Sequence, residues 1–151
     1  MCSAGTGLLS IALSSQTARY RATDIGPLIP LIRKNVSMNA ALTSKVSVEE
    51  LDWFALPARK TLTSEPPVDL ILAVDCIYHP SLVPALVEAI ELYTTPGHTA
   101  VLVVCELRAE DVLQTFLETW LSKGKDWQIW RVGRHGTLGR PFVIWMGWKS
   151  E

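Results

Sequence analysis

The hydrophobic pattern along the chain switches repeatedly between two periods. Nearly continuous apolar runs, typical of parallel strands covered on both faces, lie at 68–74 and 98–106. Apolar positions spaced three and four apart, typical of helices, lie within 5–16, 28–40, 82–93 and 112–121. Weaker strand patterns lie at 19–23 and 45–51, and a proline-rich loop is expected at 55–67. Strands and helices therefore alternate, which favours a parallel sheet covered by helices.

The end of the chain departs from this alternation. Two strand patterns, at 127–132 and 142–148, follow each other with no helical pattern between them. The connection at 133–141 is too short for a parallel crossover, so these strands must form an antiparallel hairpin. We expect one α/β domain over residues 1–151, mostly parallel with an antiparallel end.

Composition narrows the class of protein. Hydrophobic residues make up 48% and charged residues 19%, which is enough to bury a core. The net charge is −1 and no basic run is present, so a nucleic-acid partner is not expected. The apolar runs are too short to span a membrane, and no secretory signal is visible. The odd count of three cysteines suits reduced thiols in a cytoplasmic protein.

Side chains that bind metals or activate nucleophiles are scattered. The histidines, His79, His98 and His135, stand singly, so we assign no metal site and no Ser/His/Asp or Cys/His arrangement.

A short glycine motif is the first candidate binding feature. Ala4-Gly5-Thr6-Gly7 precedes a predicted helix, and Asp24 ends the next predicted strand. Glycines allow a tight turn and a close approach of a ligand, and an acid at that strand end can accept both hydroxyls of a ribose. This combination predicts an adenine-nucleoside site. The structural alternative is an ordinary strand-to-helix turn capped by Asp24.

Two further strand ends carry polar and aromatic side chains. Asp52 and Trp53 end the third predicted strand, where they can contact an adenine ring or serve only as a strand-ending acid and a packed indole. Asp75 and Tyr78 follow the strand at 68–74, at the edge where open sheets bind ligands. Asp75 can orient an amine there, with Tyr78 lining its pocket. Alternatively, Asp75 caps the next turn and Tyr78 packs on it.

These segments together resemble the family 16 methyltransferases, which include protein lysine methyltransferases and a fungal ribosomal-protein lysine methyltransferase. The resemblance extends from Ala4 over nearly the whole chain. The segments that carry it are Gly5 to Leu13, Ala22-Thr23-Asp24, Asn35 to Asn39, Leu51-Asp52-Trp53, Ala73 to Leu82 and Val103 to Arg108.

The resemblance implies a class I, Rossmann-like fold and S-adenosyl-L-methionine as cofactor. It places Gly5, Thr6 and Gly7 at the methionine side of the cofactor, Asp24 at the ribose, and Asp52 with Trp53 at the adenine. Asp75 and Tyr78 occupy the acid and aromatic positions of the family motif beside the target amine. The implied partner is a protein lysine, for instance in a ribosomal or chaperone-type protein, and we expect a monomer.

One departure from the family pattern concerns the first strand. In the family a strand ending in Glu-Leu-Gly leads into the glycine loop and lies centrally in the sheet, whereas here only Met1 and Cys2 precede Ser3. Without it, two strands are left with unpaired backbone groups, each costing about 1–3 kcal/mol if buried. We therefore expect an N-terminally incomplete methyltransferase domain that binds S-adenosylmethionine weakly.

Two alternatives remain. A catalytically inactive fragment or interaction module agrees with the missing strand. A nicotinamide-dependent oxidoreductase agrees with the glycine motif but not with the closing hairpin. For a methyltransferase, the loop that contains Arg134 and Arg140 is the candidate acceptor-binding segment, because it should emerge at the carboxyl edge of the sheet. The alternative is that this loop is only a solvated hairpin tip.

Overall fold

The computed structural model describes residues 4–56, 66–108, 110–133 and 142–151. The chain divides into two compact units, Met1–Ala55 and Leu56–Glu151, and each is described here by itself. That residues 1–151 form a single domain stays a prediction. No helix in the described ranges is long and apolar enough to cross a membrane.

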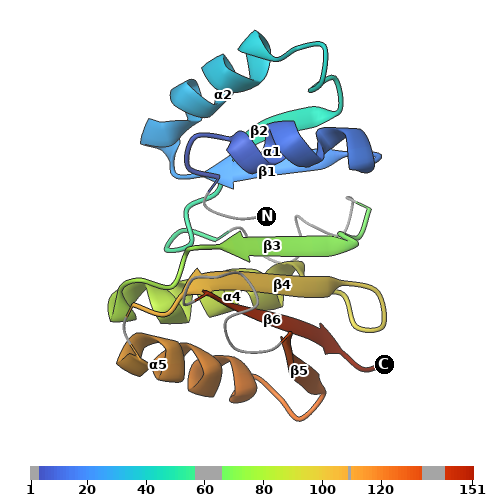
Figure 1. The fold of residues 1–151 in the computed structure, drawn as a ribbon. Coiled ribbons are helices and arrows are strands. Elements are labelled where there is room, and N and C mark those ends of the chain that lie inside the picture. The colour runs from blue at the N-terminus through green and yellow to red at the C-terminus, as the bar shows by residue number, and fades with distance from the viewer. Residues whose placement is uncertain (1–3, 57–65, 109, 134–141) are drawn as a thin grey trace. The chain divides into compact units, whose positions relative to one another are not determined.

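The first unit is a parallel strand pair with two helices (Figure 1). The elements in chain order are α1 (Leu8–Leu13), a 3₁₀ turn (Ser14–Gln16), β1 (Tyr20–Asp24), a 3₁₀ turn (Gly26–Leu28), α2 (Ile29–Met38) and β2 (Val46–Glu50). Its small core comprises Ala22 of β1 and Ile29 and Ile32 of α2. Both strands predicted in this part of the chain are confirmed, and β1 ends at Asp24 as expected.

Helix α1 buries a different face from the one its leucines suggest. Leu8 is 68% exposed and Leu9 37% exposed, whereas Ser10 and Ser14 are buried. The Ser10 hydroxyl donates to the carbonyl of Gly7, and the Ser14 hydroxyl donates to that of Leu42. These hydroxyls satisfy carbonyls inside the unit, which the apolar spacing of the sequence does not reveal.

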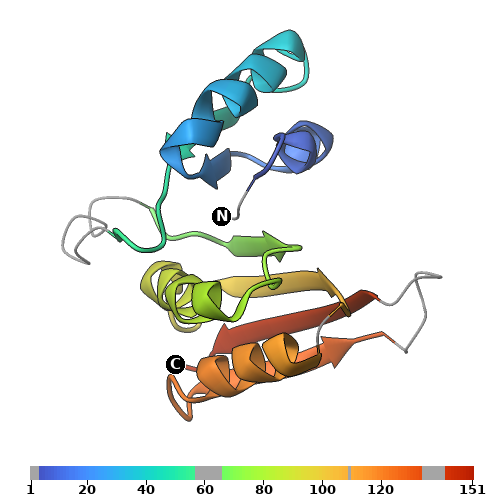
Figure 2. The same cartoon turned by 90° about the vertical axis from the view of Figure 1, so that its left-hand side faces the viewer.

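The second unit is a four-stranded sheet with two helices (Figures 1 and 2). The elements in chain order are β3 (Leu70–Val74), a 3₁₀ turn (Pro80–Leu82), α4 (Val83–Tyr93), β4 (Ala100–Glu106), α5 (Glu110–Leu121), β5 (Trp127–Val132) and β6 (Phe142–Lys149). Strands β3 and β4 are parallel, and β6 is antiparallel to both of its neighbours, β4 and β5. The predicted closing hairpin is confirmed, and β5 runs parallel to β4.

The described strands form two sheets, in the orders β1-β2 and β3-β4-β6-β5. Ala4 donates a backbone hydrogen bond to Thr23 of β1, while Asp24 accepts one from Leu51, which follows β2. Consecutive carbonyls of a strand point to opposite edges, so Ala4 lies along the edge of β1 that faces away from β2. This is the edge at which the resemblance places the first strand of the family.

The runs at 68–74 and 98–106 were expected to be covered on both faces, and within the second unit this expectation is wrong. In β4 buried and half-buried residues alternate, and in β3 Ile71 and Ala73 are buried while Leu70 is 45% exposed. Helices α4 and α5 both pack on the face that contains Val101 and Val103. The elements of this unit therefore cover one face of the sheet, and its other face retains exposed apolar side chains, including Trp130 and Met146.

A 3₁₀ turn leads into α4. Ser81, a residue type that often caps helices, lies inside this turn, which precedes Val83. His79 takes the capping role, because its ring Nδ1 accepts a hydrogen bond from the backbone N–H of Ser81.

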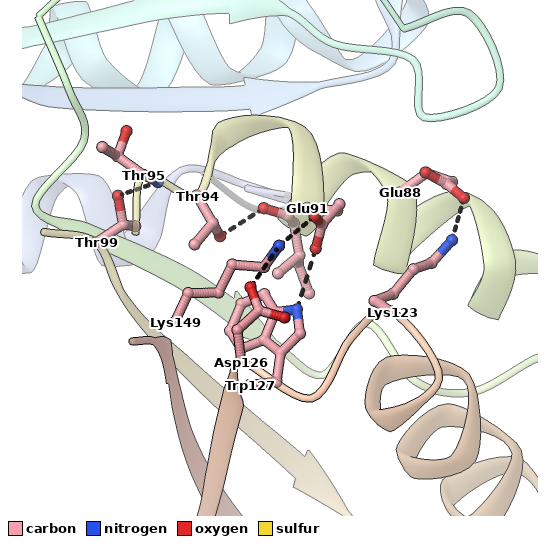
Figure 3. Close-up of polar contacts among 10 residues, drawn as sticks. Glu88, Glu91, Thr94, Thr95, Thr99, Lys123, Asp126, Trp127 and Lys149 are labelled. Carbon is pink, nitrogen blue, oxygen red and sulfur yellow. Dashed lines mark hydrogen bonds and ion pairs between the residues drawn. The ribbon is translucent and has the colours of Figure 1, made fainter. Parts of the chain in front are cut away.

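A largely buried charge cluster connects the end of β6 to α4 (Figure 3). The Lys149 side chain is 10% exposed and forms ion pairs with Glu91 and with Asp126. Its ammonium also lies 5.5 Å from the centre of the Trp127 ring, whose indole N–H donates to Glu91 at 3.0 Å. Each member of the cluster therefore has a partner, as buried charges require.

We predict that Lys149→Met lowers the free energy of unfolding by about 3 kcal/mol, because it leaves the carboxylate of Glu91 without its cation in a poorly solvated site. Lys123→Met is the matched control. Its partner Glu88 is 54% exposed, so that loss should stay below about 1 kcal/mol. Urea unfolding followed by tryptophan fluorescence measures both values. Equal losses in the two variants would show that the Lys149 cluster does not stabilise the second unit.

Candidate functional site

The glycine loop of the first unit has the geometry that only glycine adopts without strain. Gly5 has φ +57° and Gly7 has φ +82°, both in the left-handed region. A side chain at Gly7 would also come within 3.2 Å of Ile32, whereas no described residue lies within 4 Å of the position that a Cβ would take at Gly5. The loop therefore turns tightly at Gly7 and leaves open space beside Gly5.

Asp24 is connected directly to this loop. One carboxylate oxygen accepts from the backbone N–H of Gly5 and the other from that of Ile25, both at 2.9 Å. The side chain is buried, with 5% of the residue exposed. Asp24 thus holds the glycine turn in place, as the structural alternative requires. Because a carboxylate oxygen has two lone pairs, these two hydrogen bonds do not by themselves prevent Asp24 from accepting one from a ribose hydroxyl.

The turn after β2 lies at the same end of the strand pair as Asp24, since Leu51 donates its N–H to the carbonyl of Asp24 at 2.8 Å. In this turn Asp52 accepts from the N–H of Phe54 at 2.9 Å. Trp53 is half-buried, whereas Phe54 is 69% exposed. The aromatic ring most available to a ligand in this turn is therefore that of Phe54, which the sequence analysis did not select.

Thr6 is held from the neighbouring helix. The side-chain amide of Asn35, in α2, donates to the carbonyl of Thr6 at 2.8 Å. Asn35 belongs to a segment that resembles the family, but the sequence assigned it no role. Its contact fixes the loop against α2, so the structure brings together Gly5, Thr6, Gly7, Asp24 and the turn containing Asp52 and Trp53.

A cavity of about 350 Å³ also lies in the first unit, between α2 and β2. Its lining includes Arg33, Val36, Val46 and Val48 but none of the predicted site residues. We therefore give it no part in the predicted cofactor site.

In the second unit, Asp75 follows β3 with an unusual backbone conformation. Its φ is +54°, and among the described residues it is the only one other than glycine with a positive φ. Its N–H donates to the carbonyl of Val104 at 2.7 Å, which continues the pairing of β3 with β4. Aspartate tolerates this left-handed conformation better than most residues, and such strain is concentrated at functional sites.

The Asp75 side chain is paired with Arg108, a residue to which sequence reasoning gave no role. A terminal guanidinium nitrogen, Nη2, lies 3.0 Å from Oδ2 of Asp75. The same guanidinium contacts Glu106 at 2.8 Å through Nε and Nη2. The described contact of the Asp75 carboxylate is thus with the residue that follows β4. The signal in the sequence was Glu106-Leu107-Arg108 at the end of the next strand.

The pKa of the neighbouring Cys105 thiol is affected by its burial and by the negative charge of Asp75. Burial, and next the negative charge of Asp75, raise the pKa of Cys105 to about 11. The thiol therefore stays neutral at physiological pH. The carboxylates of Asp75 and Glu106 and the guanidinium of Arg108 form one charged group at the carboxyl ends of β3 and β4.

Tyr78 is 59% exposed, whereas the intervening Cys76 and Ile77 are buried. An exposed ring three residues after Asp75 is available to line a substrate channel. Arg134 and Arg140 lie outside the described residues, so their role in acceptor binding stays a prediction.

Comparison with known proteins agrees with the resemblance stated above. A profile of the family described as lysine methyltransferase matches residues 2–123, which contain every predicted cofactor-binding and catalytic residue. The chain is 33% identical over 109 residues to protein N-lysine methyltransferase METTL21A from Danio rerio, covering 71% of this chain and 48% of that protein. It is 40% identical over 82 residues to protein-lysine methyltransferase METTL21E from Mus musculus, covering 52% of this chain and 34% of that protein.

A third relative has a different name. The chain is 38% identical over 117 residues to diaminohydroxyphosphoribosylamino-pyrimidine deaminase from Schizosaccharomyces pombe, covering 75% of this chain but 27% of that protein. The chain thus spans half or less of the length of these curated relatives. Because about a quarter of the deaminase is matched, its name does not identify the activity of the matched part.

Solved structures agree on the fold. An O-methyltransferase from Bacillus cereus in complex with SAH superposes with a TM-score of 0.69 at 17% identity, covering 98% of this chain and 72% of that one. A protein from Clostridium thermocellum superposes with a TM-score of 0.69 at 17% identity, covering 99% of this chain and 86% of that one. Its proposed activity is that of a ribosomal RNA methylase. The fold is that of class I methyltransferases, a mixed α/β fold that closes on an antiparallel hairpin.

Proposed function

Because this chain belongs to the lysine methyltransferase family, we propose that it transfers a methyl group from S-adenosyl-L-methionine to a lysine side chain of a protein. The observation that carries the proposal is the family match over residues 2–123, a stretch that includes both the glycine loop and the Asp75–Arg108 pair. The named lysine methyltransferases among the relatives support a protein substrate.

The residues of the first unit fit the cofactor. Open space beside Gly5 admits the methionine part of S-adenosylmethionine, and Asp24 lies next to that space through its bond to Gly5. Asp52 and an aromatic ring of the following turn, Trp53 or the more exposed Phe54, are available to the adenine. When bound, S-adenosylmethionine supplies an electrophilic methyl group on a sulfonium.

The residues of the second unit suit an amine acceptor. Methyl transfer needs a neutral amine held in line with the methyl group. Asp75 has one carboxylate oxygen, Oδ2, engaged by Arg108, and its Oδ1 is available to accept from the amine. The exposed ring of Tyr78 can line the lysine channel and tolerate the methylated cation that forms.

The substrate, compartment and oligomeric state belong to the same proposal. A net charge of −1 without a basic run supports a protein rather than a nucleic acid as the substrate. The odd number of cysteines suits a reducing, cytoplasmic compartment, and we propose a monomer. A ribosomal or chaperone-type protein is the proposed acceptor class, on the strength of the family resemblance alone.

Calorimetry with S-adenosylhomocysteine and NAD tests the cofactor assignment. We expect S-adenosylhomocysteine to bind and NAD not to bind. We also expect a Kd above about 1 μM for the 151-residue chain, and tighter binding when a strand ending in Glu-Leu-Gly precedes Ser3, because this strand would complete the loop. Submicromolar binding by the 151-residue chain would contradict the need for that strand. Binding of NAD would favour the oxidoreductase, and no binding by either protein would favour the inactive interaction module.

A further inference from the structure

We propose that Arg108 is a positioning residue that reduces the negative charge at Asp75, so that the site favours the neutral amine of the lysine side chain. The inference rests on the proposed function and specifies how the same site selects the reactive form of its substrate. It starts from a contact that the sequence did not predict, between residues 33 positions apart in the chain.

The first step is the charge at Asp75. A lone carboxylate beside a lysine stabilises the ammonium form, because an opposite charge nearby favours the charged state of a group. The ammonium has no lone pair and cannot accept a methyl group. An aspartate alone would therefore orient the side chain while holding it in its unreactive form.

The second step is the effect of Arg108. Its guanidinium contacts Asp75 at 3.0 Å, and it is always protonated in proteins. A lysine amine that donates to Oδ1 of Asp75 would thus approach a site that already contains one cation. The like charge disfavours the ammonium and favours the amine. Because the guanidinium is shared with Glu106, it compensates part of the charge of Asp75, which keeps its ability to accept a hydrogen bond.

The third step is the support of Arg108. The contacts with Glu106, at 2.8 Å, orient the guanidinium toward Asp75. Both carboxylates raise the pKa of Arg108, through its hydrogen bond to Glu106 first and the charge of Asp75 next. Glu106 therefore holds the cation in place in a side chain that is otherwise 58% exposed.

The other described titratable groups near Asp75 and Arg108 do not supply the positive charge that Arg108 contributes. The Cys105 thiol in β4 is neutral at physiological pH because its pKa is raised to about 11. Glu110 and Asp111 lie in the first turn of α5 and add negative charge. His79, after β3, makes its described contacts with Ser81. Arg108 is thus the cation that the described structure places against Asp75.

The pH dependence of methyl transfer tests the inference. A free lysine amine has a pKa of about 10.4, and the rate should rise with pH as the bound amine loses its proton. Arg108→Gln removes the cation, so the ammonium is stabilised and the rising limb should move up by about one pH unit. The kcat at high pH should stay within about twofold of the original. Arg108→Lys keeps the charge and should keep the position of the limb.

The assay follows radiolabelled methyl transfer from S-adenosylmethionine into the proteins of a cell lysate, between about pH 7 and pH 11.5, so that the plateau above the rising limb is recorded as well. Arg19→Gln is the matched control for loss of one arginine charge, since Arg19 is exposed before the amino end of β1. Its profile should superpose on that of the unsubstituted protein.

A second readout does not depend on the cofactor or on activity. The Nε–H group of Arg108 has its own ¹⁵N NMR signal, which should shift in Asp75→Asn and move further in Glu106→Gln, where its direct acceptor changes. Unshifted signals in both variants would show that the contacts are not made in solution.

The outcomes separate the inference from the proposed function. An Arg108→Gln profile that is lower at every pH, with its limb unmoved, would assign Arg108 a structural role and overturn the inference. A profile identical to that of the unsubstituted protein would overturn it too. If the unsubstituted protein transfers no label to lysine at any pH, with or without the added first strand, the proposed function itself fails.

Discussion

Asp75→Asn should lower kcat for methyl transfer into protein lysine by about 100-fold, the lower end of what a positioned acid or base contributes. The amide keeps the size of the side chain but loses the charge and one of the two acceptor oxygens. Asparagine also tolerates the left-handed backbone that Asp75 adopts at φ +54°, so the turn should survive the change. Affinity for S-adenosylhomocysteine should stay within about twofold, because the predicted cofactor residues lie elsewhere in the chain.

Radiolabelled methyl transfer measures the activity, and calorimetry with S-adenosylhomocysteine measures the affinity. Asp69→Asn is the matched control, because Asp69 immediately precedes the same strand and its side chain is 92% exposed. Full activity in Asp75→Asn would show that this carboxylate does not orient the amine, and the catalytic assignment would fail with it.

Asp24→Ala should weaken S-adenosylhomocysteine binding by about ten- to hundredfold, since hydrogen bonds to a charged group contribute about 1.5–3 kcal/mol. The structure gives a second reason to expect weaker binding. Asp24 also accepts from the N–H groups of Gly5 and Ile25, so the alanine variant should loosen the glycine loop as well. Asp24→Asn retains one carbonyl oxygen and should lose less affinity than Asp24→Ala.

Calorimetry gives the affinities, and thermal unfolding without ligand measures the structural share of the effect. Glu49→Gln is a suitable control, because Glu49 forms a surface ion pair with Arg21 on the same strand pair. A variant that unfolds at a lower temperature yet binds S-adenosylhomocysteine with unchanged Kd would leave Asp24 only its role as the cap of the turn.

Local sequence patterns predicted part of the candidate site. Gly5, Gly7 and Asp24 were selected because a glycine turn and a strand-ending acid recur at a characteristic spacing, and the structure joins them through the Gly5–Asp24 bond. Phe54 was passed over in favour of Trp53, although Phe54 is the exposed ring. Neighbours in a turn differ in exposure by the direction of each side chain, and residue type does not report that direction.

The two charge clusters of the second unit depend on contacts across the fold. Lys149 is paired with Glu91, 58 residues earlier in the chain. Such pairs depend on which helix packs over which strand, and on the register between strands. Neither is encoded in a short segment.

The sequence by itself determined the order and kind of the elements, the closing antiparallel hairpin, and the placement of Asp24 and Asp75 at strand ends. These properties follow from residue periodicity and loop length, which act over a few residues. Only the tertiary structure decided that the continuous apolar runs of β3 and β4 are covered on one face within their unit, and that Arg108 meets Asp75. A strand can have the same apolar sequence whether helices cover one face of its sheet or both faces. The contact of Arg108 with Asp75 arises from the parallel register that sets Val74 opposite Val104, and this register is a property of the assembled sheet.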